Sequence, residues 1–521
     1  MTIPGSSCAT RFRGLLRPIG DSAPRNDNPE AMFGNMIAPS ADAIGRETGV
    51  CEVASGMNNT PHCVMFLDAN PQAYPCIQAF FSFHAGIYNK PFPQIERRCN
   101  MSETAWKVVP EDVEILRKLG VRKREIAESP INQERRRLWY KHDRFEGERP
   151  MVLVEGGVAF ELLPCSELRC REEWARQVER SLAYEIFRFE FLKDDHVVLP
   201  YIDWNWKVHM SDFGVQSVQH YAERVSGNVS SRRWDPPLQD LEKDFDKLHF
   251  RHISVDREGS LAWRDLLTQV FDGILTVRQR GGFWWTTGMT QTAIDLVGLE
   301  QFMTYMCINP DGVHRLMAFL RDDLLHITEW LEQEGLYALN NENDYIGSGS
   351  MGFTEDLPQK DWTPGNPVRR KDLWVLSESQ ETSEVGPEMF EEFVFRYQLP
   401  IVQQFGLCYY GCCEPLHLKW NIIRRFPNLR RVSISPWCDQ AYMAEAMGNH
   451  YVFSRKPNPA YVSTPDFDEE VIRKDIAATL DIARNNTVEL ILKDVHTICN
   501  EPRRLARWVE IAYEEIEKRC G

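Results

Sequence analysis

The sequence predicts an α/β protein, a (β/α)8 TIM barrel over residues 105–521 that is preceded by an irregular and helical extension over residues 1–104. From residue 151 onward, short apolar runs alternate with amphipathic helical stretches, as expected for a parallel sheet whose crossover helices cover its faces. About seven or eight of these runs are strand candidates, a number that favours a closed barrel over an open sheet. No glycine-rich dinucleotide fingerprint or phosphate loop follows any of them, so no nucleotide site is predicted.

Composition and charge exclude several classes of protein. The 521 residues are 43% hydrophobic, enough for a large core, and the formal net charge is −16, which makes a nucleic acid or an anionic membrane an unexpected partner. The 14 cysteines are too few in a chain of this length for a disulfide scaffold and indicate a reduced compartment. No apolar run reaches the about 20 residues of a membrane span, and the first residues lack the apolar core of a secretion signal, so we expect a cytoplasmic protein.

The first part of the chain begins irregularly and then becomes helical. Residues 1–60 are rich in Gly, Ser, Pro and Asn without periodicity, which indicates a loose tail or an irregular cap. Pro110, followed by two acids, is typical of a helix start, and Gly120 is the expected end of that helix. A second helical stretch over residues 123–140 is predicted to break or kink at Pro130.

Strand and helix candidates alternate through the remainder of the chain. The run MVLVEG at residues 151–156 is short, apolar and bounded by charge and glycine, as expected for a strand that is covered on both faces. Further strand candidates of this kind are residues 196–204, 274–279, 336–344, 373–380, 407–410, 430–435 and 488–494. Helix candidates with one apolar stripe are residues 175–192, 313–331, 387–401, 472–480 and 505–516.

The stretch 407–439 places thiols and a carboxylate at the ends of two successive strands. Cys412, Cys413 and Glu414 lie where the first strand gives way to a helix, and Cys438 follows the next strand. The carboxyl ends of parallel strands meet on one face, which carries the chemistry in barrels and in open sheets. We therefore expect these side chains to converge at one site.

Other candidate residues follow other predicted strands. Glu378, Asp203 and His496 each lie at or just beyond an apolar run and are the predicted acid–base groups. Trp204 and Trp206 come directly after Asp203, a polar and aromatic combination that suits a pocket for a flat substrate.

Five segments occur in an order that resembles one known family. They are PEMFEEFVFRYQLPIVQQF, YYGCCEPLH, RRVSIS followed by WCD, YVFSRKPNPAYV and LKDVHTICNEPRRL. From about residue 105 to its end, the chain is similar to the uroporphyrinogen decarboxylase superfamily, which includes tetrapyrrole decarboxylases and cobalamin-dependent methyltransferases. The resemblance implies a TIM barrel with its site at the carboxyl ends of the strands.

The methyltransferase branch of this family implies a zinc site and a corrinoid partner. The related thiol methyltransferases carry a His-x-Cys pair after the corresponding strand, whereas Tyr410 stands here in the His position and is assigned to the substrate. Glu378 or Cys438 would then have to supply the missing donor. Zinc prefers thiolate, imidazole and carboxylate ligands. The expected metal ligands are Cys412, Cys413, Glu414 and Cys438.

The decarboxylase branch implies an arginine-rich segment that grips substrate carboxylates. Arg149 and Pro150 lead here into MVLVEGGVAFELL, which contains no arginine. A polyanionic tetrapyrrole needs several bidentate cations to offset its desolvation, so this difference argues against that substrate. Arg278 and Arg280 are the residues expected to replace part of that function.

Three hypotheses follow for the function. The leading one is a methyltransferase that demethylates an O- or N-methylated small molecule, or methylates a thiol, with zinc and a corrinoid on a carrier protein as expected cofactors. The first alternative is a cofactor-free decarboxylase of a tetrapyrrole or an aromatic acid, in which Asp203 would stabilise the protonated ring. The second is a non-catalytic barrel that binds a tetrapyrrole or a partner protein. A homo-oligomer is compatible with each of them.

Overall fold

The computed structural model describes residues 106–155, 159–163, 167–221, 232–280 and 286–520. The predicted extension over residues 1–104 lies outside the described residues. Among the helices that are described, none is both long and apolar enough to cross a membrane.

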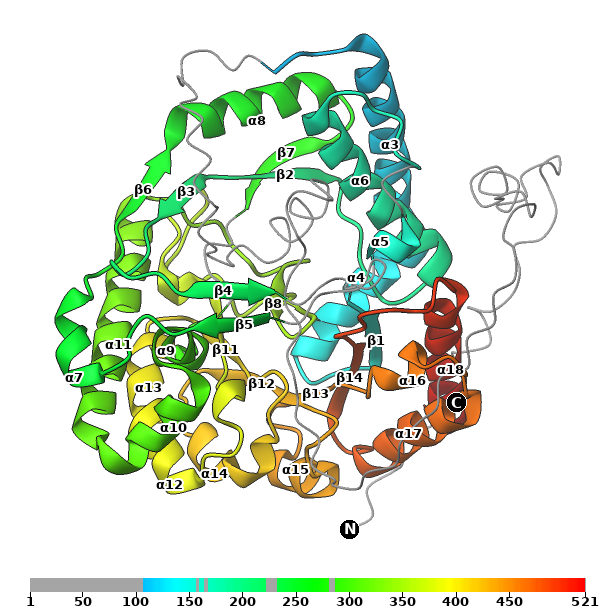
Figure 1. Ribbon diagram of the computed structural model, residues 1–521. Coiled ribbons are helices and arrows are strands. Elements are labelled where there is room, and N and C mark those ends of the chain that lie inside the picture. Colours follow the sequence, from blue (N-terminus) through cyan, green and yellow to red (C-terminus); the bar gives the residue numbers. More distant parts are fainter. Residues whose placement is uncertain (1–105, 156–158, 164–166, 222–231, 281–285, 521) are drawn as a thin grey trace, which may run out of the picture. The chain divides into compact units, whose positions relative to one another are not determined.

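The largest sheet has six parallel strands (Figure 1). Its spatial order is β1-β14-β13-β12-β11-β10, so β1, in cyan, lies beside β14, in red, although the two come from opposite ends of the described chain. Almost every residue of these strands is buried, which is why apolar residues predominate in them. The strands are β1 (Met151–Val154), β10 (Trp374–Ser377), β11 (Leu407–Tyr410), β12 (Leu429–Ile434), β13 (Val452–Arg455) and β14 (Thr487–Leu492).

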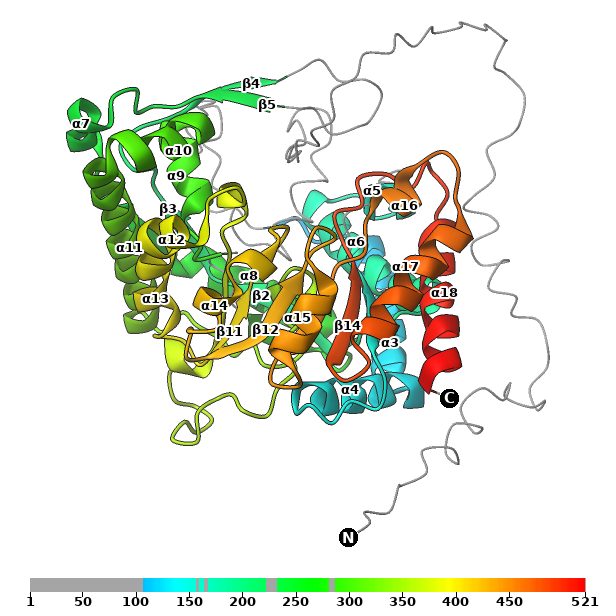
Figure 2. The same cartoon turned by 90° about the horizontal axis from the view of Figure 1, so that it is seen from below.

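Amphipathic helices cover the sheet. Helix α18 packs on β1 and runs beside α17, as Figure 2 shows, and its predicted apolar stripe belongs to the main hydrophobic core. The predicted helix over residues 387–401 is a continuous run of α12 (Pro387–Phe390), a π-helical segment (Glu391–Phe395) and α13 (Arg396–Val402). The longer helices are α3 (Pro110–Glu128), α4 (Pro130–Asp143), α6 (Glu173–Phe187), α8 (Arg257–Phe271), α11 (Pro310–Gln333), α17 (Glu469–Ile482) and α18 (Arg503–Cys520).

Helix α3 continues past Gly120, so the prediction that this glycine ends the helix is wrong. A Cβ atom at Gly120 would lie only 3.0 Å from the ring of Phe271 in α8, so the glycine permits close packing of the two helices. The chain breaks instead at Ser129, whose Oγ accepts a hydrogen bond from the Asn132 backbone N–H at 3.3 Å, and Pro130 occupies the first turn of α4. The predicted break at Pro130 is confirmed.

The predicted closed barrel of eight strands is not shown. Strands β2 (Tyr201–Asn205) and β7 (Thr276–Arg280) form a separate parallel pair, and in the described part of the chain neither pairs with β1 or β10. The polar stretch between them forms antiparallel pairs, β3 (Lys207–Met210) with β6 (Ile253–Asp256) and β4 (Val218–Tyr221) with β5 (Arg232–Asp235). Apolar periodicity identifies strands but not which backbones meet.

Two buried carboxylates take the place of strand pairing between β1 and the segment that leads to β2. Asp195 accepts a hydrogen bond from the Val152 N–H at 2.8 Å, and Asp194 accepts one from the Val154 N–H at 3.0 Å. Arg149 and Arg188 each form an ion pair with one of these carboxylates, both at 2.7 Å. The donors of β1 are thus satisfied without a neighbouring strand on this side.

An amide side chain takes part in the corresponding contact beside β10. The Asn340 amide donates to the Trp374 carbonyl at 3.1 Å and accepts from the Trp374 N–H at 2.9 Å. On the other side, the Gln279 side chain of β7 donates to the Leu336 carbonyl at 2.9 Å. Residues 336–340 were expected to be part of a strand, but they are linked to both neighbours by side chains and form none.

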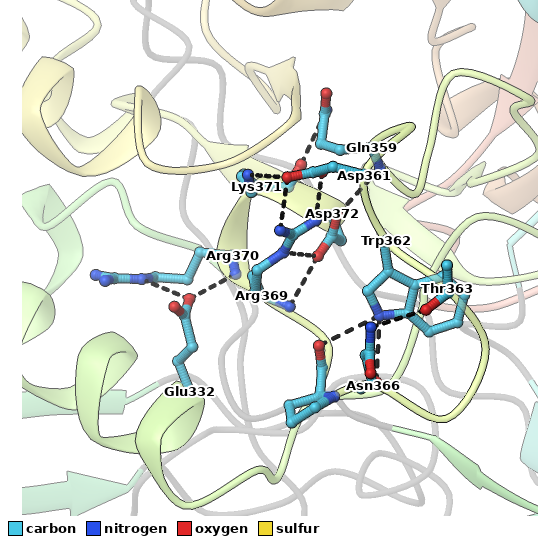
Figure 3. A network of polar contacts seen from close by, with 11 residues as sticks. Glu332, Gln359, Asp361, Trp362, Thr363, Asn366, Arg369, Arg370, Lys371 and Asp372 are labelled. Atoms are coloured by element: carbon cyan, nitrogen blue, oxygen red, sulfur yellow. Dashed lines mark hydrogen bonds and ion pairs between the residues drawn. The ribbon is translucent and has the colours of Figure 1, made fainter.

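The loop that leads into β10 is held by a network of ion pairs around Asp372 (Figure 3). The buried Asp372 carboxylate accepts hydrogen bonds from the backbone N–H groups of Gln359 and Arg369, both at 3.0 Å, and from the Arg369 guanidinium at 2.7 Å. Asp361, which is 59% exposed, pairs with the same guanidinium and with Lys371. This network lies at the amino end of β10.

Replacing Asp372 by Ala is expected to lower the free energy of unfolding by about 2–3 kcal/mol, because two backbone donors and a guanidinium lose a buried charged acceptor. Asp361→Ala, in the same network, should lower the free energy of unfolding far less because its ion pairs are exposed. Urea denaturation of both variants checks this difference. Equal losses from the two variants would contradict it.

Candidate active site at the carboxyl ends of the strands

Ionisable side chains directly follow four of the six strands of the main sheet. Glu378 follows β10, Lys456 follows β13, Lys493 follows β14 and Glu155 follows β1. Because all six strands are parallel, these residues share one edge. The edge therefore carries acids and amines side by side.

The ends of β10 and β11 are joined by the buried carboxylate of Glu414. It accepts hydrogen bonds from the backbone N–H groups of Ser379, at 2.9 Å, and of Cys412, at 2.8 Å. Gly411 makes the turn between β11 and the thiols with a φ of 98°, and a Cβ atom there would lie 2.7 Å from Leu416. Of the predicted set, Cys412, Cys413 and Glu414 lie together, and Glu378 directly precedes the Ser379 amide that Glu414 binds, whereas Cys438 contacts residues 416 and 417.

The two thiols contact a buried lysine from β14. The Lys493 Nζ lies 3.3 Å from the Cys412 Sγ and 2.7 Å from an Asp494 carboxylate oxygen, and the Cys413 Sγ lies 3.5 Å from the same oxygen. The hydrogen bond from Cys413 and the Lys493 ammonium lower the pKa of the Cys412 thiol. Cys412 is buried, whereas Cys413 is half-buried and Asp494 is exposed, so the pair lies at the border with solvent.

Two buried acids just after β10 have raised pKa values. Burial, together with the charges of Glu381 and Glu414, raises the pKa of Glu378 well above its ordinary value. The Glu378 carboxyl is fixed by hydrogen bonds from the Thr286 hydroxyl at 3.2 Å and from the Gln380 N–H at 2.9 Å. Burial also raises the pKa of Glu381 to about 7. Both side chains are therefore suited to donate a proton near neutral pH.

Gly288 leaves space for Glu378, and the Gln398 side chain binds the backbone of both residues. A Cβ atom at Gly288 would lie 2.2 Å from the Glu378 carbonyl oxygen and 2.6 Å from its carboxyl oxygen, so no larger residue fits there. The buried Gln398 of α13 donates to the carbonyl oxygens of Gly288, at 2.9 Å, and of Glu378, at 2.8 Å. The carboxyl is thus positioned from both sides.

The shifted pKa of Glu381 predicts a measurable pH dependence of stability. Its pKa is about 7 in the folded chain against an ordinary 4.5, so between these values the folded chain binds a proton that the unfolded chain has lost. The free energy of unfolding should therefore fall as the pH rises through this window, by on the order of 3 kcal/mol for this group. Glu381→Gln removes that loss.

Urea denaturation at about pH 5 and about pH 8 compares the two chains. The difference between Glu381→Gln and the parent chain should shift in favour of the variant at the higher pH. Glu384→Gln, at an exposed position three residues away, is the matched control and should follow the parent. A difference that does not change with pH would contradict the assignment.

The predicted substrate arginines are paired with acids. Arg278 lies 3.2 Å from Asp203 and 2.8 Å from Glu342, and Arg280 forms an ion pair with Asp344. The charges of both guanidinium groups and of Asp203 are thus matched within the protein.

The predicted aromatic pocket is not brought together with the thiols. Trp204 and Trp206 are in contact with each other, with ring centroids 4.9 Å apart. Arg264 and Arg257 of helix α8 lie over their rings. Trp204 belongs to the hydrophobic cluster formed with α3, α6 and α8, because alternate residues of a strand point to opposite faces. These rings pack against the helix layer.

Three further predicted residues have different surroundings. Tyr410 is completely buried, and its hydroxyl donates to the Gln398 side chain at 3.0 Å, so it supports the residue that positions Glu378. Cys438 is buried next to the backbone of residues 416 and 417, and burial raises its pKa to about 11. His496 is exposed, two residues beyond Asp494.

The predicted zinc ligands do not form a metal site as they are placed. Both carboxylate oxygens of Glu414 accept backbone N–H groups, and Cys438 is buried against the backbone of residues 416 and 417. Among the residues that the structure describes, no group of three or more His, Cys, Asp and Glu side chains could hold a metal ion. The donor set that the sequence suggests therefore does not fit zinc.

Sequence reasoning missed the lysines and one acid of this edge. Lys493 and Lys456 end the runs VELILK and YVFSRK, and Glu155 ends MVLVE. A charged residue that terminates a buried apolar run at its carboxyl end is the signal that could have identified all three. Burial lowers the pKa of Lys456 to about 7, and this side chain donates to the Ser454 carbonyl at 3.2 Å.

Comparison with known proteins finds similarity of structure and none of sequence. No protein-family model matches the sequence, and no curated protein matches it. Among solved structures, a methyltransferase from Methanosarcina mazei is similar with a TM-score of 0.42 and 9% sequence identity, over 73% of this chain and 98% of that one. A similarity at this level carries no argument about the reaction of this chain. The resemblance to the uroporphyrinogen decarboxylase superfamily stays a prediction.

Proposed function

We propose that the chain is a methyltransferase that takes the methyl group of an O- or N-methylated small molecule and passes it to a thiol or to a corrinoid on a carrier protein. One observation carries the proposal. At a single sheet edge, Glu414 joins the turn of a carboxylic acid with a raised pKa, Glu378, to the turn of a thiol that is held against an ammonium group, Cys412 beside Lys493.

Glu378 is suited to protonate the leaving group. Breaking the bond between a methyl carbon and an ether oxygen leaves an alkoxide or phenoxide, and a positioned neutral carboxyl can protonate it as the bond breaks. Glu378 holds its proton because it is buried near Glu381 and Glu414. Hydrogen bonds from Thr286 and Gln380 fix its direction.

The methyl acceptor can be a thiol. When the thiol of a second substrate is the acceptor, its thiolate lone pair forms the new bond to the methyl carbon, the carbon–oxygen bond breaks, and the released oxygen takes the proton of Glu378, which regains a proton from water. The Lys493 ammonium, 3.3 Å from the Cys412 Sγ, supplies the positive charge that favours thiolate at this edge. A corrinoid, when it is the acceptor, supplies a reduced cobalt nucleophile as a co-substrate. No step requires zinc.

The decarboxylase alternative finds less support in the described contacts. A tetrapyrrole or aromatic acid needs unpaired cations for its carboxylates, and the two predicted arginines already bind Asp203, Glu342 and Asp344. The non-catalytic alternative assigns no role to Glu378 or to the thiols of Cys412 and Cys413.

A methyl-transfer assay on the full chain tests the proposal. Reduced cobalamin is incubated with the chain and with methoxylated aromatic compounds or methylated amines, and the absorbance of methylcobalamin is followed. The expected result is chain-dependent methylation with at least one donor class, unaffected by a chelator. Absence of transfer from every donor, together with carbon dioxide release from an aromatic acid or a tetrapyrrole, would replace the proposal by the decarboxylase alternative.

A further inference from the structure

Cys412 and Cys413 present two sulfur atoms to the same place. Their Sγ atoms lie 3.6 Å apart, although consecutive side chains of a strand point to opposite faces. The positive φ of Gly411 takes the chain out of strand geometry just before the pair. The two thiols therefore do not alternate between faces as they would in a strand.

We propose that Cys412 and Cys413 are a reversible oxidation site, at which a hydroperoxide forms a disulfide between adjacent residues. The inference goes beyond methyl transfer and does not require it, because disulfide formation is read directly from the mass of the chain.

The geometry makes such a disulfide labile. A relaxed disulfide has Cα atoms about 4.4–6.8 Å apart, whereas consecutive Cα atoms across a trans peptide are about 3.8 Å apart. The two sulfur atoms are close enough to meet, but the bond between them would be strained. Strained disulfides have high reduction potentials and are the ones that cells break again. The pair is therefore suited to reversible modification and not to stabilising the fold.

The surroundings favour the reaction at these thiols over others. The Lys493 ammonium lies 3.3 Å from one sulfur and 3.9 Å from the other, and a neighbouring cation favours the reactive thiolate. Asp494, in contact with Cys413, has 46% of its side chain exposed, so this side of the pair borders on solvent. Redox-sensitive cysteines are typically accessible and lie next to a second, resolving cysteine.

The proposed step balances with a hydroperoxide as the oxidant. The sulfur of Cys412 attacks the peroxide, forms a sulfenic acid and releases one molecule of water or alcohol. The sulfur of Cys413 then attacks the Cys412 sulfur, the disulfide forms and a molecule of water leaves. The two thiols lose two electrons and two protons in total, and the peroxide is reduced. A small dithiol reverses the reaction.

The chain contains its own control for this experiment. Cys408 lies four residues before Cys412 but is completely buried, and trypsin should release all three cysteines in one peptide, residues 397–419. The full reduced chain is treated with hydrogen peroxide, denatured, alkylated, digested and sequenced by mass spectrometry. Position within the peptide then separates these thiols from every other cysteine.

We expect this peptide to lose two hydrogen atoms, to carry no alkyl group at Cys412 and Cys413, and to keep the alkyl group at Cys408. Dithiothreitol should restore both labels. In Cys413→Ser, Cys412 should instead proceed to the irreversible sulfinic acid, while Cys307→Ser, at an exposed cysteine on another helix, should behave like the parent chain. Separate oxidation of the two thiols in the parent, without a disulfide, would overturn the proposal.

A second probe needs no variant and therefore no assumption about folding. Phenylarsine oxide bridges two thiols that lie close together and is released by a dithiol but not by a monothiol. The native chain should bind it within peptide 397–419. A chain that shows neither arsenical binding nor disulfide formation there would exclude the pair as an oxidation site, whereas failure of the methyl-transfer assay alone would leave this result unchanged.

Discussion

Glu378→Gln is expected to lower the kcat of methyl transfer by about 100- to 10,000-fold, the range that a positioned general acid contributes. The amide keeps the shape of the carboxyl but has no proton to give to a leaving oxygen. KM should change little, since the hydrogen bonds from Thr286 and Gln380 reach oxygen positions that the amide can partly keep. Initial rates with the donor found in the cobalamin assay measure the effect.

The pH profile and a matched variant complete this test. The rate of the parent chain should fall at a pH where Glu378 finally loses its proton, and that limb should disappear in the variant. Glu388→Gln, on the exposed side of α12, is the control and should keep the parent rate. A kcat within about threefold of the parent in Glu378→Gln would contradict the assigned role.

Arg431→Met should lower the free energy of unfolding by about 3–5 kcal/mol, the usual cost of removing one partner from a buried ion pair. Arg431 of β12 is completely buried; its guanidinium lies 2.9 Å from Asp143 of α4 and 3.3 Å from Glu489 of β14. Although burial opposes it, His142 and Arg431 hold the pKa of Glu489 below its ordinary value. The variant would leave this acid inside the protein without its cation.

Urea denaturation of single and double variants separates charge from packing. Adding Glu489→Gln to Arg431→Met should recover part of the loss because the uncompensated charge disappears. Arg424→Met, at an exposed position, should change the free energy of unfolding by less than about 0.5 kcal/mol. If Arg431→Met costs no more than this control, the buried ion pair does not stabilise the fold.

The main sheet could be predicted because its strands are buried on both faces. Short apolar runs such as residues 151–154 and 488–492 leave no ambiguity between strand and surface loop. The closed barrel could not be predicted, because pairing at β1 and β10 depends on single side chains. The side chains of Asp195 and Asn340 accept hydrogen bonds from strand N–H groups that a neighbouring strand would otherwise accept. Hydrophobic periodicity does not predict such contacts.

The site was predictable in part for a related reason. Cys412, Cys413, Glu414 and Glu378 come from adjacent strands, so position along the chain was enough to bring them together. Lys493 comes from a strand that lies three places away in the sheet, and its contact with Cys412 is a property of the folded sheet alone. The prediction of an aromatic pocket at Trp204 and Trp206 was wrong because two neighbours in sequence, Asp203 and Trp204, point to opposite faces of one strand.

The Glu414 carboxylate links the backbone next to the acid to the backbone of the thiol. It accepts the first amide N–H after Glu378 and the amide N–H of Cys412, so one side chain holds together the two turns that carry the acid and the thiol. In Glu414→Asp the side chain is one methylene shorter and should no longer reach both amides. Glu378 and Cys412 would then lose their relative alignment, although neither residue is changed. Glu414, which contacts no substrate in this proposal, is therefore the residue that aligns the two reacting groups.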